Sequence, residues 1–285
     1  ITLLLMRYLS IRKQRSKYRA LSVRVMSSYQ GVISWHNRGN NIIISSDKYC
    51  FKVKRLQAKE ATMKILHTAD WHLGKLIHGI YMTEDQAFLL DALIDYIETE
   101  KPDLIIIAGD LYDRAIPPVA AIHLLDAFLN RVVLELNIPL IAISGNHDSP
   151  QRLSFGRNFL NHQACHIVTE FDPSFTPIVM NDEYGKVHIY PIPYVEPSQI
   201  RQIYPDAGIH SHDDAFRIMM EHLVPQLDPS ARNILILHAF VIHSSQPEKL
   251  VSDSERPLAI GGSEYISADY LTDFDYVALG HLHQA

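Results

Sequence analysis

At 285 residues, 47% of them hydrophobic and 20% charged, the chain is long enough to bury the core of one large α/β domain or two modest ones. Its two cysteines, Cys50 and Cys165, fit no disulfide framework or thiolate metal site, which makes a reducing cytoplasm the expected location. No apolar run approaches the roughly 20 residues of a membrane span, and the net charge of −6 is not that of a strongly basic nucleic-acid binder.

Residues 1–62 differ in charge from the remainder of the chain. They hold 13 of the 26 lysines and arginines but only two of the 32 acids, so their net charge is +11 and that of the remainder is −17. They show no sustained helical or strand period, whereas an ordered pattern begins at Met63. We therefore expect residues 1–62 to be a basic leader, disordered or non-native, ahead of a folded domain over residues 63–285.

Three origins for this leader remain open at the level of the sequence. It could be a targeting peptide, a basic arm that grips nucleic acid, or upstream DNA translated in frame with the gene. We favour the last, because codons for residues 59–61 can spell a bacterial ribosome-binding sequence a few bases before Met63.

Apolar strands alternate with helices after Met63. The pattern predicts a strand, a helix, a strand, a helix and a strand over residues 64–68, 83–100, 104–108, 118–136 and 139–143. This βαβαβ order indicates an α/β fold. The continuous apolar runs at 104–108 and 140–143 are typical of strands covered on both faces, so both should be central in a sheet. Thr83 is expected to cap the helix that follows it.

The second half of the chain predicts shorter elements. We expect a helix over 149–160, strands near 165–168, 176–180 and 186–190 that continue the sheet with antiparallel pieces, a helix over about 211–224, and buried strands at 233–238 and 276–279.

Metal-type ligands, rather than ordinary turn residues, follow five of the apolar strands. In chain order the groups are Asp70-Trp71-His72, Gly109-Asp110-Leu111-Tyr112-Asp113, Gly145-Asn146-His147-Asp148, His238 and Gly280-His281-Leu282-His283. Ligands of open α/β sheets bind at the carboxyl ends of the strands. One histidine at a strand end is more often a hydrogen-bonded structural residue, but five such groups in this order predict a metal site on one rim.

This pattern resembles the calcineurin-like metallophosphoesterase superfamily from Met63 to the end of the chain. It is most similar to the bacterial SbcD family, the nuclease subunits of an exonuclease complex. Two stretches carry this finer likeness, residues 65–74 (ILHTADWHLG) and 252–265 (SDSERPLAIGGSEY). The resemblance implies a β-sandwich flanked by helices, that is, an α/β/β/α architecture.

The resemblance also implies a set of metal ligands. One cation would be held by Asp70, His72, Asp110 and His283, and the other by Asp110, Asn146, His238 and His281. Asp110 would bridge the two. The oxygen and imidazole donors favour Mn²⁺, with Fe and Zn as open alternatives.

Two further residues would act on the substrate in this scheme. His147 would stabilise or protonate the leaving oxygen, and Asp113 would hold the imidazole of His147 in position. Asp113 could instead be a solvated loop acid, and Asp148 could be the supporting partner of the site.

The implied activity is that of a metal-dependent DNA exonuclease and endonuclease, in which two metal ions activate a water for phosphodiester hydrolysis. The implied partners are double-stranded DNA ends and hairpins, an SbcC-type SMC-like ATPase, and a second nuclease subunit in a homodimer or heterotetramer, acting in DNA repair. One alternative is a phosphomonoesterase or cyclic-nucleotide phosphodiesterase with the same metals. A catalytically silent scaffold for the ATPase is the other. Because SbcD-family proteins continue beyond the last ligand, we expect the capping and partner-binding regions to be absent here.

Overall fold

A computed structural model describes residues 63–242 and 265–281 in full, together with the backbone of five strands that precede Met63. Those strands are β1 (Met6–Arg12), β2 (Ala20–Met26), β3 (Ser34–Arg38), β4 (Asn41–Ser46) and β5 (Tyr49–Lys54). β1 pairs in antiparallel fashion with β2 on one side and with β6 (Lys64–Thr68) on the other. The assignment of residues 1–62 as a leader stays a prediction.

The first sheet has the strand order β11-β10-β9-β6-β1-β2. Its parallel part consists of β6, β9 (Leu104–Ala108), β10 (Leu140–Ile143) and β11 (Cys165–Val168). Every residue of β9 and β10 is buried, which confirms their predicted central place. The expectation of an antiparallel piece is wrong for β11. A helical crossover between β10 and β11 returns the chain to the same end of the sheet, and this produces a parallel neighbour.

Two long helices cover the outer face of this sheet. α1 (Thr83–Glu100) turns Leu90, Leu93 and Ile97 inward, and α2 (Val119–Leu129) continues as a π-helical turn over Asn130–Glu135. Both helices fall where the sequence predicts them. The Thr83 hydroxyl makes no capping hydrogen bond, because Met82 is the N-cap and Thr83 is already the first helical residue.

The predicted helix over 149–160 is two short helices instead, α3 (Pro150–Leu153) and α4 (Arg157–Asn161). The chain breaks between them at Gly156, whose φ of 75° lies in the left-handed region that ends a helix.

The second sheet has the order β12-β13-β14-β17. β12 (Ile178–Asp182) and β13 (Gly185–Ile192) form an antiparallel hairpin, whereas β13, β14 (Arg232–His238) and β17 (Tyr276–Gly280) are parallel. α6 (His212–Leu223) covers the outer face and was predicted, while α5 (Pro197–Ile203) was not. The remaining short elements are β7 (Leu76–Ile77), β8 (Ile80–Tyr81), β15 (Phe240–Ile242), β16 (Tyr265–Ser267) and 3-10 turns at Val224–Gln226 and Ala268–Leu271.

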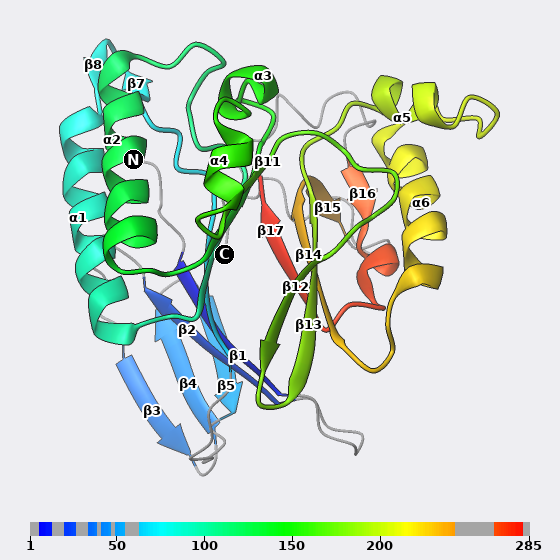
Figure 1. The fold of residues 1–285 in the computed structure, drawn as a ribbon. Coiled ribbons are helices and arrows are strands. Elements are labelled where there is room, and N and C mark those ends of the chain that lie inside the picture. The colour runs from blue at the N-terminus through cyan, green and yellow to red at the C-terminus, as the bar shows by residue number, and fades with distance from the viewer. Residues whose placement is uncertain are drawn as a thin grey trace.

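Three hydrophobic clusters hold four layers together. One lies between α1, α2 and the first sheet, one between the two sheets, and one between the second sheet and α6. Figure 1 shows the helices on the two outer sides and the strands between them. The α/β/β/α architecture expected from the resemblance is confirmed. Within the described ranges, no helix has both the length and the apolar character needed to cross a membrane.

A buried ion pair joins Arg232 of β14 to Asp182 of β12 within the second sheet. Arg232 is 2% exposed and donates to both carboxylate oxygens of Asp182, at 2.7 and 2.5 Å, and to the carbonyl of Gly185 at 3.0 Å. Asp182 also accepts from the main-chain N–H of Met63 at 3.4 Å, which links the second sheet to the first. Burial acts to raise the pKa of Asp182, but the hydrogen bonds and charge of Arg232 outweigh it and hold that pKa below its usual value.

Arg232→Met should therefore lower the free energy of unfolding by about 3 kcal/mol, since it leaves a carboxylate without its cation in a largely buried place. The low pKa of Asp182 means that this pair stabilises the fold above the ordinary carboxyl pKa, and that the stabilisation is lost as the pH falls through the lowered value. Urea unfolding at neutral and acidic pH checks both points. A variant as stable as the parent at neutral pH would contradict this assignment.

Removal of residues 1–62 should leave the domain folded, because all assigned metal ligands and the parallel strand order from β6 to β11 lie after that segment. Thermal unfolding of the shortened chain beside the full chain is the measurement. The deletion makes β6 an edge strand, so a large fall in the midpoint would show that the segment packs on the domain.

Candidate metal centre

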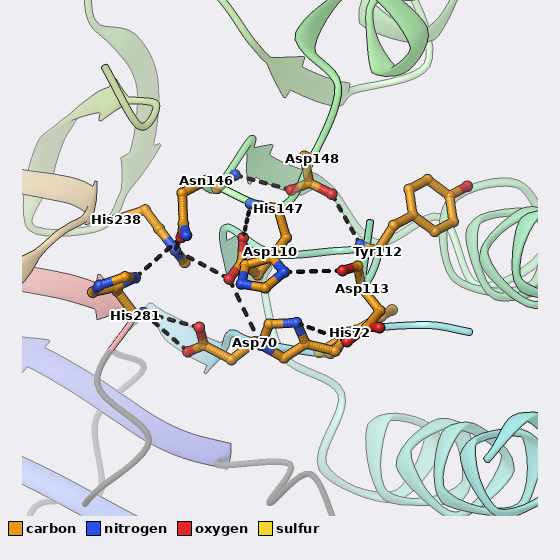
Figure 2. Close-up of polar contacts among 12 residues, drawn as sticks. Asp70, His72, Asp110, Tyr112, Asp113, Asn146, His147, Asp148, His238 and His281 are labelled. Carbon is orange, nitrogen blue, oxygen red and sulfur yellow. Dashed lines mark hydrogen bonds and ion pairs between the residues drawn. The ribbon is translucent and has the colours of Figure 1, made fainter. Parts of the chain in front are cut away.

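Five loops at one rim bring Asp, His and Asn side chains together. Asp70 and His72 follow β6, Asp110 follows β9, Asn146 and His147 follow β10, His238 ends β14, and His281 follows β17. These side chains point toward a common centre in Figure 2. The predicted convergence of strand-end side chains on one rim is therefore present among the described residues. His283 lies outside the described residues.

Asp110 occupies the middle of this cluster and is 1% exposed. Its Oδ2 lies 3.6 Å from Nε2 of His72 and 3.4 Å from Nε2 of His238, on opposite sides. Its Oδ1 accepts from the main-chain N–H of His147 at 2.9 Å. Burial alone would raise the pKa of Asp110, but the hydrogen bond and charge of His238 and the charge of His72 hold it well below its usual range. Asp110 is therefore a carboxylate at neutral pH.

His238 is oriented by a main-chain carbonyl. Its Nδ1–H donates to the carbonyl of Ala108 at 2.8 Å, so Nε2 faces Asp110 and the Oδ1 of Asn146, the latter at 3.0 Å. Burial lowers the pKa of His238, yet the neighbouring Asp110 raises it to about 9. A ring nitrogen this close to two oxygens needs a positive charge between them, which either a proton or a metal cation can supply.

The remaining ligands are tied to one another across the two sheets. Nδ1 of His281 lies 3.1 Å from Oδ1 of Asn146, and the main-chain N–H of His281 donates to both oxygens of Asp70 at 2.9 and 3.1 Å. The rings of His238 and His281 meet edge to face at 5.1 Å. Asp70 thus joins the loop after β6 to the end of β17, although these segments belong to different sheets.

Four of the ligand residues have a strained backbone conformation. Asp70, His72, Asp110 and His281 all have positive φ, at 57°, 45°, 52° and 77°. Such a conformation costs of order 1 kcal/mol or more for a residue other than glycine, so the surroundings must enforce it. Main-chain bonds from Asp70 to Gly109 and from His72 to Asp110, at 3.0 and 2.9 Å, lock the two loops together.

Two glycines permit the close approach of the ligand loops. A Cβ on Gly145 would lie 2.1 Å from Oδ1 of Asp110, and one on Gly280 would lie 1.8 Å from the carbonyl oxygen of Ala108. Both distances are too short for any side chain. The glycine that precedes Asn146 and the one that precedes His281 are therefore required by packing.

Gln86 supports the loop of His72, a role that the sequence analysis missed. Its side chain is buried, accepts from the N–H of Gly74 at 2.9 Å and donates to the carbonyls of Trp71 and His72 at 3.3 and 2.7 Å. A polar residue on the inward face of α1 was the available signal, since Gln86 shares that face with Leu90 and Leu93.

Asp148 joins the loops after β9 and β10. Its buried carboxylate accepts from the N–H groups of Leu111, Tyr112 and Gly145 at 2.9–3.1 Å. Burial raises the pKa of Asp148 to about 6, against the lowering effect of those donors. The contacts fit the supporting role considered for this residue, because all three donors are main-chain groups of the two loops.

His147 lies at the open edge of the cluster, with its side chain exposed and its ring 4.7 Å from that of His72. Its Nδ1–H donates to the main-chain carbonyl of Asp113 at 2.9 Å. Asp113 is thus the residue that contacts the His147 ring, and the contact is made by its main-chain carbonyl. The Asp113 carboxylate instead lies 3.7 Å from Nδ1 of His72.

The described residues fit a pair of divalent cations. Three groups have ligand atoms within 4.8 Å of one another, namely Asp70-His72-Asp110, Asp110-His238-His281 and His72-Asp113-His147. The first two share Asp110, as a bridging carboxylate requires. Their carboxylate and imidazole donors suit Mn, Fe or Zn.

Comparison with known sequence families agrees with this geometry. Residues 63–285 match the family described as calcineurin-like phosphoesterase. The match covers both sheets from β6 onward, the covering helices and every residue assigned to the cluster. The protein therefore belongs to the calcineurin-like phosphoesterase family of metal-dependent phosphoester hydrolases, whose members bind two divalent metals.

Proposed function

We propose that this protein is a metal-dependent DNA nuclease that hydrolyses phosphodiester bonds. The observation that carries the proposal is the Asp110 carboxylate, buried between the imidazoles of His72 and His238 at 3.6 and 3.4 Å. When bound there, two cations supply positive charge for the phosphoryl oxygens and lower the pKa of the attacking water. Mn²⁺ is the proposed cation, because the donors are oxygens and imidazoles.

Different residues of the cluster bind the cations, act on the leaving oxygen and position the imidazole that does so. Asp70, Asp110 and the imidazoles hold the cations at fixed places, since their loops are bonded to one another. His147 is exposed at the edge of the cluster and can reach the leaving oxygen of a bound ester, where its imidazole would stabilise or protonate that oxygen. Asp113 is a positioning residue whose carbonyl fixes the His147 ring.

DNA, rather than a small phosphomonoester, is the proposed substrate on the strength of the SbcD-like stretches at 65–74 and 252–265. The net charge of −17 after residue 62 opposes strong independent binding of DNA. We therefore propose that an SbcC-type ATPase supplies much of the affinity for DNA ends and hairpins. A phosphomonoesterase or cyclic-nucleotide phosphodiesterase with the same metals is the alternative.

We also propose that the nuclease subunit pairs with a second copy and works in the cytoplasm. Ile116, Val119 and Phe155 are 68–89% exposed, and they are the apolar side chains that we propose contact this copy. The cysteine content supports a reducing location, since Cys165 is a free thiol in the core.

Asp110→Ala should abolish binding of both cations, because this carboxylate faces both halves of the cluster, whereas His72→Ala should weaken mainly one. Elemental analysis after loading with Mn²⁺ and desalting measures the occupancy. Asp95→Ala, which removes an exposed acid of α1, is the control and should retain two ions. Two-metal occupancy in Asp110→Ala would show that the bridge is misassigned.

His147→Gln should reduce hydrolysis about 10²–10⁴-fold, the usual contribution of a positioned acid or base, with both cations still bound. Asp113→Asn should cost less, because the main-chain carbonyl that contacts His147 remains. The assay uses Mn²⁺ with blunt, hairpin and single-stranded DNA, with and without the ATPase, beside p-nitrophenyl phosphate.

The matched control is His123→Gln, an exposed histidine of α2, which should retain full activity. Near-normal turnover by metal-loaded His147→Gln would remove this residue from the mechanism. Cleavage of the monoester alone, with no DNA cleaved in either condition, would favour the alternative function.

A further inference from the structure

A small pocket opens directly beside the metal cluster. Asn146, His238 and His281 form one of its walls, and its volume is about 90 Å³. The remaining lining comes from α6, from the end of β14, from β16, and from segments that follow β13 and β14. Because the pocket shares Asn146, His238 and His281 with the cluster, one substrate molecule can place its phosphate at the metals and another of its groups in the pocket.

The floor of this pocket is apolar. Ala215, Phe216, Met219, Leu237 and Ile266 line it, and each is at most 3% exposed. A charged phosphoryl group would lose its hydration there without gaining a partner, so the phosphate stays at the metals. The floor is suited to an apolar portion of the same substrate.

Two aromatic side chains stand at the mouth. Tyr194 and Phe240 line the pocket and are half-buried. The Tyr194 hydroxyl donates to Glu196 at 3.0 Å, which holds the phenol ring in place. Fixed aromatic faces at a pocket mouth favour a flat ring over an aliphatic chain, because rings pack in offset or edge-to-face contact.

The position of the pocket determines which of the two ester groups of a bound phosphodiester lies beside it. His147 packs against His72 and contacts Asp113, whereas the pocket lies at Asn146, His238 and His281, on the other side of Asp110 in Figure 2. If His147 serves the leaving oxygen, the leaving group departs away from the pocket. The group beside the pocket is then the one that stays on phosphorus.

We propose that this pocket binds an aromatic ring of the retained ester group of a phosphodiester, such as the base of the nucleotide that keeps the phosphate. This inference rests on the proposed function, since a phosphomonoester carries no retained organic group. A cavity of roughly 150 Å³ suffices to enclose benzene. At about 90 Å³, the pocket takes one ring in part and leaves the remainder at the aromatic mouth.

The test compares two diesters with the same leaving group in the Mn²⁺-loaded full chain. Bis(p-nitrophenyl) phosphate retains an aromatic group, whereas methyl p-nitrophenyl phosphate retains a methyl group. Ala215→Leu fills the floor and should lower kcat/KM for the first substrate about tenfold or more, since a blocked apolar contact has at least that effect. The methyl ester should change less than twofold. The matched control, Ala120→Leu on the exposed side of α2, should change neither.

Binding gives a readout that does not depend on turnover. Calorimetry should show phenylphosphonate binding more tightly than methylphosphonate, and Ala215→Leu should remove that preference. Equal effects of Ala215→Leu on both diesters, or an unchanged phosphonate preference, would overturn the subsite. Absence of diester turnover by the unsubstituted chain together with normal phosphonate preference would overturn the proposed activity and leave the subsite standing.

Met219→Ala covers the case in which Ala215→Leu does not fold. This change enlarges the floor, so the ratio of kcat/KM for a naphthyl p-nitrophenyl diester to that for the methyl diester should rise several-fold. A ratio equal to that of the unsubstituted chain would contradict the proposal.

Discussion

The structure around the rim depends on one buried charge. Asp110 is a carboxylate with 1% exposure, placed where water cannot solvate it. Such a charge is tolerated only if cations or donors surround it. His72 and His238 stand on its two sides, and the His147 N–H donates to its other oxygen. The carboxylate is stabilised because imidazole and main-chain N–H groups from both sheets lie around it.

Fixing this carboxylate constrains the backbone around it. Asp70, His72 and Asp110 adopt left-handed conformations that non-glycine residues avoid. The strain is offset by hydrogen bonds that tie the loops to one another and to α1, notably those of Asp148 and Gln86. Because the loops are coupled in this way, the ligands form one rigid set. Rigidity of this kind allows a site to hold charge in place without reorganising.

Much of the fold follows from local sequence pattern. Helix α1 and the strands β6, β9 and β10 fall within a residue of their predicted limits, because apolar runs and turns mark them clearly. The split at Gly156 and the parallel direction of β11 were missed, since they depend on where the chain crosses over.

The site could be predicted in its residue types but not in its contacts. Spacing placed Asp110 and His238 at strand ends, and the structure brings them to 3.4 Å. Whether the Asp113 carboxylate or its carbonyl meets His147 depends on a loop conformation that no sequence pattern specifies. The most direct test of the account is anomalous diffraction from crystals soaked in Mn²⁺. Two peaks about 3.5–4 Å apart, both in contact with Asp110, are the predicted result, and a single peak, or a pair that does not share Asp110, would contradict it.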